Sequence, residues 1–75
     1  MLKTTSTDLA RHIDQLALGD EQTFHCVDEH NPEAAFHFNQ ELQRLRRERR
    51  VVLLIRKSTG YTHSQDTVVR VCRTS

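Results

Sequence analysis

Several features that commonly reveal a function are scarce or missing in this sequence. The chain has only two glycines, Gly19 and Gly60, so it contains no glycine-rich loop of the kind that cradles phosphates. The chain has neither a Cys-x2-Cys pair nor a His-x3-His pair, two common spacings of zinc ligands. We therefore expect free thiols, no metal site and no cofactor.

Long apolar segments are missing too. No run approaches the roughly 20 apolar residues that a membrane-spanning helix needs. The first residues, MLKTTSTDLARHIDQ, lack the apolar core and the small-residue cleavage site of a secretory signal. The pattern predicts a cytoplasmic protein without a membrane partner, in which the two cysteines stay reduced.

Signatures of catalysis and of the common nucleic-acid-binding domains are also absent. His12 with Asp14, and His63 with Asp66, supply titratable groups but match no recognised catalytic motif. A pocket of even about 300 Å³ would occupy much of so small a domain, so we predict that the protein is not an enzyme. The chain has none of the signatures of homeodomains, C2H2 fingers, basic zippers, KH domains or RRM domains.

The sequence does have a strong separation of charge. Its net charge is only +1, yet residues 1–42 carry two basic and eight acidic side chains, whereas residues 43–75 carry nine basic and two acidic ones. The two parts therefore have net charges of −6 and +7. This asymmetry indicates an anionic partner for the basic part, unless the two parts neutralise each other within the fold or across a dimer.

The 75 residues predict a single domain, residues 1–75, near the size at which one hydrophobic core is barely sufficient. A first helix is predicted with Thr5 or Ser6 as its N-cap and Gly19 as its C-cap. Its expected apolar stripe consists of Leu9, Ile13, Leu16 and Ala17. Residues 22–27 then predict a strand with Phe24 and Cys26 on one face.

The strongest local signal is the start of a second helix. Asn31 is the expected N-cap, Pro32 occupies the first helical position and Glu33 lies beside the positive end of the helix dipole. The apolar side chains recur every three or four positions, as they do on one face of a helix. They are Ala35, Phe38, Leu42 and Leu45.

Residues 51–57 and 67–73 are rich in β-branched side chains and predict two strands joined by the polar loop 58–66. A right-handed crossover through the second helix makes the first two strands parallel, and the third strand is antiparallel to the second. We therefore predict a two-layer α/β (α+β) domain of order α-β-α-β-β. It has a three-stranded mixed sheet, a C-terminal β-hairpin and both helices on one face.

The strand at 51–57 has aliphatic side chains on both faces. Alternation places Val51, Leu53 and Ile55 on one face and Val52 and Leu54 on the other. Unless the first helix crosses over to cover it, the second face is an exposed apolar patch, completed from the last strand by Val68 and Cys72 or by Val69 and Val71. We expect this patch to be an interface, in a homodimer or with another protein, and we take Val52, Leu54, Val68 and Cys72 as its residues.

Five arginines fall within the seven residues from Arg44 to Arg50, at the end of the second helix. Glu41 and Glu48 can each reach Arg44, but two carboxylates do not balance five guanidinium groups. A guanidinium group binds two oxygens of a phosphate or carboxylate at once. The arginine run is therefore either a nucleic-acid grip or the solvated end of a helix.

We predict a small nucleic-acid-binding accessory or regulatory protein that grips the phosphate backbone of DNA or RNA. Tyr61, in the polar loop, is available to stack on a base. The predicted contact residues are Arg44, Arg46, Arg47, Arg49, Arg50, Arg56, Lys57, Tyr61 and Arg70. The alternative is an adaptor or inhibitor that docks on another protein through an apolar sheet face or a strand edge, without nucleic acid.

Overall fold

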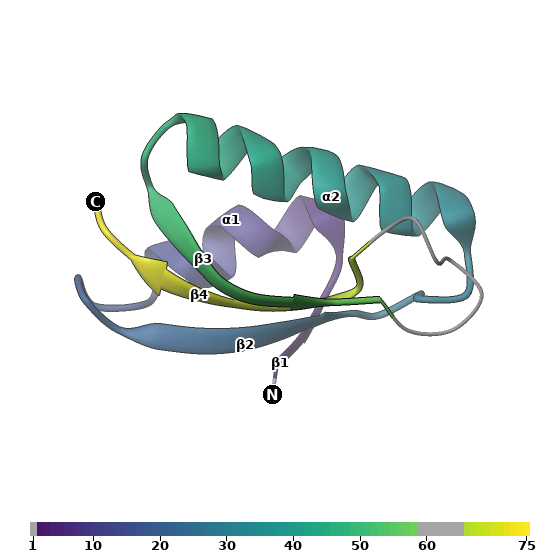
Figure 1. Ribbon diagram of the computed structural model, residues 1–75, viewed down its shortest axis with the longest axis horizontal. Coiled ribbons are helices and arrows are strands. Elements are labelled where there is room, and N and C mark those ends of the chain that lie inside the picture. Colours follow the sequence, from purple (N-terminus) through teal and green to yellow (C-terminus); the bar gives the residue numbers. More distant parts are fainter. Residues whose placement is uncertain (1, 59–65) are drawn as a thin grey trace.

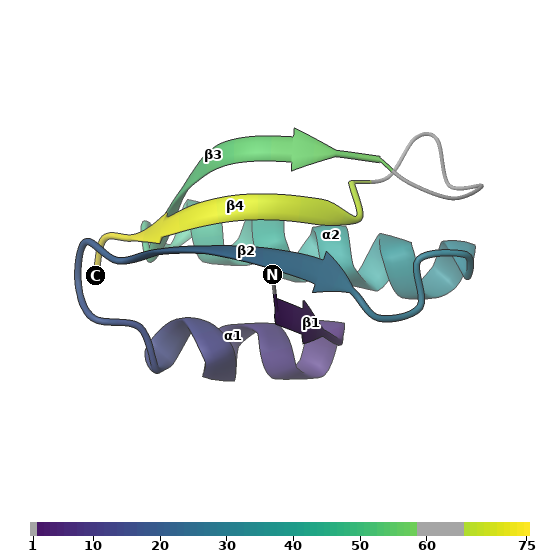
Figure 2. The ribbon, with the colours of Figure 1, turned by 90° about the horizontal axis from the view of Figure 1, so that it is seen from below.

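Six elements make up the part of the chain that the computed structural model describes, residues 2–58 and 66–75 (Figure 1). In chain order they are β1 (Leu2–Thr4), α1 (Ser6–Asp14), β2 (Glu21–Cys26), α2 (Pro32–Arg47), β3 (Val51–Lys57) and β4 (Val68–Arg73). The four strands form one sheet in the order β1-β2-β4-β3, so the last strand lies between the two that precede it (Figure 2). The predicted mixed class with two helices is confirmed.

The prediction of a three-stranded sheet is wrong, because Leu2–Thr4 adds a fourth strand. β1 runs parallel to β2, with Leu2 opposite Phe24 and Thr4 opposite Cys26. Three residues are too few for an alternating pattern to show in the sequence, and the strand exists only because β2 offers it a hydrogen-bonding edge. The predicted strand directions are confirmed: β2 and β3 are both antiparallel to β4, and β3 and β4 form a hairpin.

Local capping chemistry explains where the helices begin. The Asn31 side chain accepts hydrogen bonds from the backbone N–H groups of Glu33 (3.0 Å) and Ala34 (3.4 Å), as predicted for the start of α2. Thr5 caps α1 in the same way, through the N–H of Asp8. Gly19 is not the C-cap of α1, because the helix ends at Asp14 and Gly19 lies in the following turn with φ +87°.

Both helices lie on the same face of the sheet, as predicted (Figure 1). The side chains of α2 that follow the helical repeat are buried against side chains from β2 and β4. This core consists of Leu9, Ile13, Phe24, Cys26, Phe38, Leu42, Leu45, Val51, Val69 and Val71. The side chains of Val68, Arg70 and Cys72 alternate with the buried ones of β4, so they lie on the opposite, outer face of the sheet.

The expectation that Ile55 lies on the same face as Val51 and Leu53 is wrong. A bulge between Leu53 and Ile55 inserts Leu54 into β3, so that Leu53 is paired with Val71 but Ile55 is paired with Arg70. Residues directly opposite each other share a face of the sheet. Because one extra residue reverses the alternation, Ile55 moves to the outer face, where its side chain is 60% exposed.

Candidate functional site

The arginine run spans the end of α2 and the turn into β3. The turn is a Schellman motif, in which Arg50 donates its backbone N–H to the carbonyl of Leu45 and Arg49 donates to that of Arg46, both at 3.0 Å. Arg49 has φ +61°, in the left-handed region where glycine is the usual residue. This sharp turn keeps the last arginines of α2 next to the first residues of β3.

Arg44 forms ion pairs with carboxylates of its own helix and of the helix cap. Its guanidinium group donates to Glu41, three residues earlier, and to Glu48, four residues later, where the distance to Oε2 is 2.8 Å. These hydrogen bonds, with Glu41 contributing most, raise the pKa of Arg44 and keep its charge fixed. Arg44 is therefore already paired within the molecule, as the spacing of the two glutamates predicted.

Arg50 and Arg70 pair with carboxylates from distant parts of the chain. Arg50 contacts Asp14 at the end of α1. Arg70, on the outer sheet face, donates to Glu21 Oε1 at 3.1 Å and to Thr23 Oγ1 at 2.9 Å. Part of the charge separation seen in the sequence is thus neutralised inside the fold.

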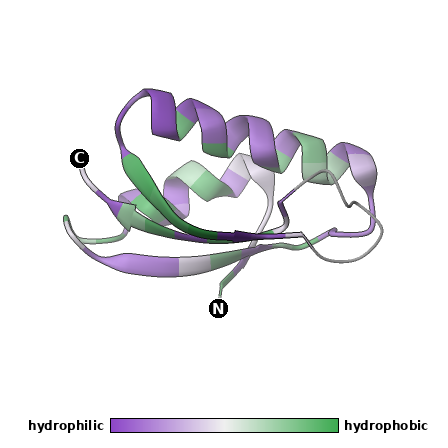
Figure 3. Ribbon diagram, in the orientation of Figure 1, coloured by the Kyte–Doolittle hydropathy of each residue, from purple (hydrophilic) through white to green (hydrophobic). Residues whose placement is uncertain are grey.

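The other cations among the predicted contact residues are Arg46, Arg47, Arg49, Arg56 and Lys57, all exposed. Within residues 2–58 and 66–75, none of these five has a carboxylate within ion-pairing distance. Arg46 donates to the neutral side chain of Gln43 at 3.0 Å. They form two groups, one at each end of β3, with an aliphatic stretch between them (Figure 3). Tyr61 lies outside the described residues.

The free edge of β3 is the second component of this site. In the described part of the chain, β3 pairs only with β4, and it forms the margin of the sheet (Figure 2). Its aliphatic side chains are unusually exposed: 50% for Val52, 45% for Leu54 and 60% for Ile55. About half of the peptide groups of such a strand point away from its neighbour, because their direction alternates along the chain.

A shallow groove, wide open to solvent, connects the arginines to this edge. It has a volume of about 440 Å³ and runs between the last turns of α2 and the first half of β3. Its lining residues are Gln43, Arg46, Arg47, Val51, Val52 and Leu53. The groove therefore combines two cations that no carboxylate of the described residues pairs with and the aliphatic start of an edge strand.

The four predicted interface residues are distributed over β3 and β4. Val52 lies directly opposite Cys72, and both are on the outer face. Val68 lies on the same face but is only partly exposed and is paired with Lys57. Leu54 is the extra residue of the bulge. Sequence reasoning missed Ile55, which is the most exposed of the aliphatic side chains in β3.

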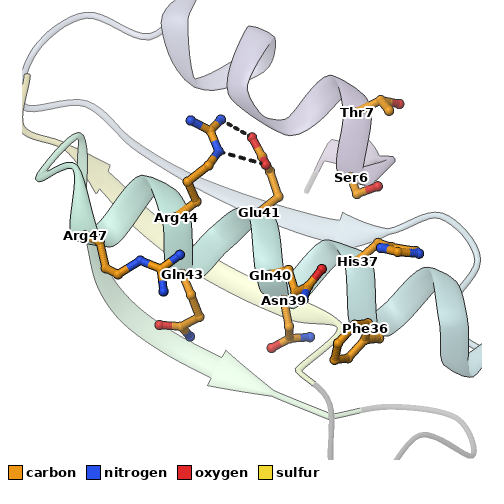
Figure 4. A pocket seen from close by; sticks show the side chains of 10 residues that line it. All are labelled: Ser6, Thr7, Phe36, His37, Asn39, Gln40, Glu41, Gln43, Arg44 and Arg47. Atoms are coloured by element: carbon orange, nitrogen blue, oxygen red, sulfur yellow. Dashed lines mark hydrogen bonds and ion pairs between the residues drawn. The ribbon is translucent and has the colours of Figure 1, made fainter.

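A wider depression lies on the outer side of the helix layer, with a volume of about 1070 Å³ (Figure 4). It is formed by α2 and the start of α1, and Figure 4 shows Arg44 turned toward Glu41 along its side. Asn39, at its edge, bridges the carbonyls of Ala35 and Asp66 and so ties α2 to the start of β4. These polar groups are occupied by structural bonds, and the depression is a broad, open surface.

Other reactive groups do not add to the site. Within the described ranges, no three His, Cys, Asp or Glu side chains are placed to hold a metal ion, and no helix is long and apolar enough to cross a membrane. His25 Nε2 lies 2.7 Å from Glu29 Oε2, but His25 is on β2, which β4 separates from β3. Burial raises the pKa of the Cys26 thiol, which keeps this core side chain neutral.

The chain matches no protein-family model, no curated protein and no solved structure.

Proposed function

We propose that this protein is an interaction module that captures an extended segment of another protein by adding it as a further strand beside β3. The observation that carries the proposal is β3 itself, a seven-residue strand at the margin of the sheet with three exposed aliphatic side chains. The proposal follows the second of the two functions predicted from the sequence.

The backbone supplies the first part of the binding energy. A segment laid along β3 pairs its N–H and C=O groups with those that point away from β4, which is how several peptide-binding domains take up extended ligands at a sheet edge. The side chains supply the second part. Fully burying an aliphatic side chain contributes about 1.5–3 kcal/mol, so a half-exposed one retains about 1 kcal/mol that a partner can recover.

The C-terminal half of β3 limits where the segment pairs. Soluble proteins protect sheet edges from uncontrolled pairing with bulges and charged residues. Both devices occur here, since the bulge lies at Leu54 and the cations Arg56 and Lys57 follow it. The first half of β3, next to the groove, has neither, so we propose Val51–Leu53 as the principal pairing region.

The test is a selection of random octapeptides displayed on phage against the immobilised protein. Selected peptides are then titrated against wild type, Val52→Glu and the control Val27→Glu. Val27 is 54% exposed at the end of β2 and donates its backbone N–H to Thr4 of β1, at the sheet edge opposite β3, so it matches Val52, which is 50% exposed. We expect Val52→Glu to weaken binding about tenfold and Val27→Glu to leave it unchanged. Equal affinity for both variants contradicts the proposal.

A second candidate is the nucleic-acid grip predicted from the sequence, now restricted to fewer residues. It is supported by the three exposed cations Arg46, Arg47 and Arg49, which lie close together at the end of α2 and have no carboxylate partner in the described part of the chain. Three phosphate contacts give a modest and strongly salt-dependent affinity.

The second candidate is tested by measuring the affinity for duplex DNA, single-stranded DNA and RNA by fluorescence anisotropy at about 50 and 200 mM salt. A grip on phosphate requires binding that falls steeply with salt and disappears in the double variant Arg46→Ala, Arg47→Ala. Absence of binding at the lower salt concentration removes nucleic acid as a ligand.

A further inference from the structure

We infer that the segment captured by β3 is an acidic one, in which aliphatic and acidic side chains alternate. This inference rests on the proposed function and names the chemistry of the partner. It follows from the position of the unpaired arginines relative to the strand edge.

Side chains of an added strand point alternately to the two faces of the sheet. On the helix side of β3 they enter the groove that Arg46 and Arg47 line together with Val51 and Leu53. On the outer side they meet Val52 and Ile55, which are 50% and 60% exposed. A matching segment therefore has acidic side chains facing the helix and aliphatic side chains facing outward, which gives a repeat of two.

The charged side chains that line the groove and those at the end of β3 are all cationic. Arg46 and Arg47 lie beside its first half, and Arg56 and Lys57 form its end. No carboxylate of the described residues pairs with any of the four. Exposed ion pairs contribute little individually, but a bidentate guanidinium–carboxylate contact at the margin of an apolar groove also fixes orientation. An anionic partner is the one that this arrangement favours.

A second copy of the chain fits the edge less well. Antiparallel pairing of two β3 strands about Leu54 sets Lys57 of each copy opposite Val51 of the other. The cations at the end of one strand then lie against Arg46 and Arg47 beside the start of the second. Four cations meet at each end of such an interface, none of them paired with a carboxylate of the described residues, and like charges so placed disfavour pairing.

The experiment uses fluorescein-labelled, end-capped heptapeptides and measures anisotropy at about 50 mM salt. The probes are TVEVEVT, its neutral isostere TVQVQVT and its cationic counterpart TVKVKVT. We expect TVEVEVT to bind about tenfold more tightly than TVQVQVT, and TVKVKVT to bind more weakly than both. In the double variant Arg46→Glu, Arg47→Glu the order of the acidic and cationic peptides reverses.

A matched control carries the same change in charge elsewhere. Lys3 and Arg11 are exposed on β1 and α1, at the opposite side of the molecule, so the variant Lys3→Glu, Arg11→Glu alters net charge equally without touching the groove. We expect it to keep the wild-type order of the three peptides. A reversal in this control as well shows a general effect of net charge and overturns the assignment to Arg46 and Arg47.

Backbone methylation separates failure of the acidic preference from failure of strand addition. TVEVEVT is prepared with N-methyl groups on its three valines or on its two glutamates. Strand addition uses the N–H groups of alternate residues only, so one methylated peptide loses binding and the other keeps it. If this contrast is seen but the three charge variants bind equally, strand addition stands and the acidic partner is wrong.

Three further outcomes overturn both proposals. They are binding of both methylated peptides with the parent's affinity, absence of binding by every peptide, and sedimentation of the protein alone as a dimer that the peptides do not dissociate. A dimer that TVEVEVT does dissociate assigns the β3 edge to a second copy and overturns the acidic partner alone.

Discussion

Replacing Arg49 by glycine should stabilise the protein. Arg49 adopts φ +61° in the Schellman turn after α2. For a residue with a Cβ atom this conformation costs about 1–2 kcal/mol, whereas glycine adopts it freely. The turn is also fixed from outside, because the Arg49 carbonyl accepts hydrogen bonds from Thr74 Oγ1 at 2.9 Å and Ser75 Oγ at 3.1 Å. The backbone therefore cannot relax to relieve the strain.

Two smaller effects reduce the stability gained by Arg49→Gly. Glycine loses more backbone entropy on folding, by roughly 0.5–1 kcal/mol. A positive charge near a helix C-terminus is favourable by about 0.3–1 kcal/mol at low salt, but here Arg46, one turn earlier, opposes it with a like charge. We expect a net increase of about 0.5–1 kcal/mol in the free energy of unfolding. For a domain of this size that corresponds to a rise of about 2–8 °C in Tm.

Urea denaturation followed by circular dichroism measures the effect. Arg49→Ala is the matched variant, because it removes the same charge but keeps the Cβ atom in the left-handed conformation. We expect the midpoint to rise for Arg49→Gly and to stay unchanged or fall for Arg49→Ala. If the two variants are equally stable, the positive φ does not cost what this reasoning requires, and the charge alone explains any difference.

Three other changes test the fold. Asn31→Ala removes the N-cap of α2 and should lower the free energy of unfolding by about 1 kcal/mol in the same urea titration. Asn31→Ser should retain most of the stabilisation that the cap provides. Leu42→Ala opens a cavity in the core and should cost about 2–5 kcal/mol, while Phe36→Ala, at a half-exposed position, should cost far less. The raised pKa of Cys26 means that the folded protein holds this proton at a pH where the unfolded chain has released it. Stability should therefore fall as pH rises above about 8.5, and in Cys26→Ala this part of the pH dependence should be absent from unfolding measured between pH 7 and pH 10.

The elements that could be predicted from the sequence are those whose signals are local. The start of α2 depends on Asn31 and Pro32, whose capping chemistry needs only neighbouring residues, and its buried stripe follows from the helical repeat. β3 was predicted with its observed bounds, because its β-branched and aliphatic residues form an uninterrupted run. The contact of Arg44 with Glu41 and Glu48 could be predicted for the same reason, since all three lie within two turns of one helix or its cap.

What could not be predicted depends on distant segments. β1 exists through its pairing with β2, and the bulge at Leu54 through the register with β4. The division of the arginine run into paired and unpaired side chains also lies beyond the sequence, because Asp14 is far from Arg50 in the chain and adjacent to it in the fold. The candidate site was therefore predicted as a set of cations and an apolar patch, without the groove that joins them.

The central position of β4 has a consequence for how the protein is made. Synthesis proceeds from the N-terminus, so β2 and β3 are complete before the strand that lies between them. Until residues 68–73 leave the ribosome, β2 and β3 lack β4, the antiparallel strand with which both form hydrogen bonds. The sheet that positions Phe24 and Val51 in the core is incomplete until then. A nascent chain halted in the loop before β4 would thus expose two aliphatic strands, a state prone to aggregation. The last of these elements to be synthesised is the one that closes the sheet, so β2 and β3 can join one sheet only after residues 68–73 have been made.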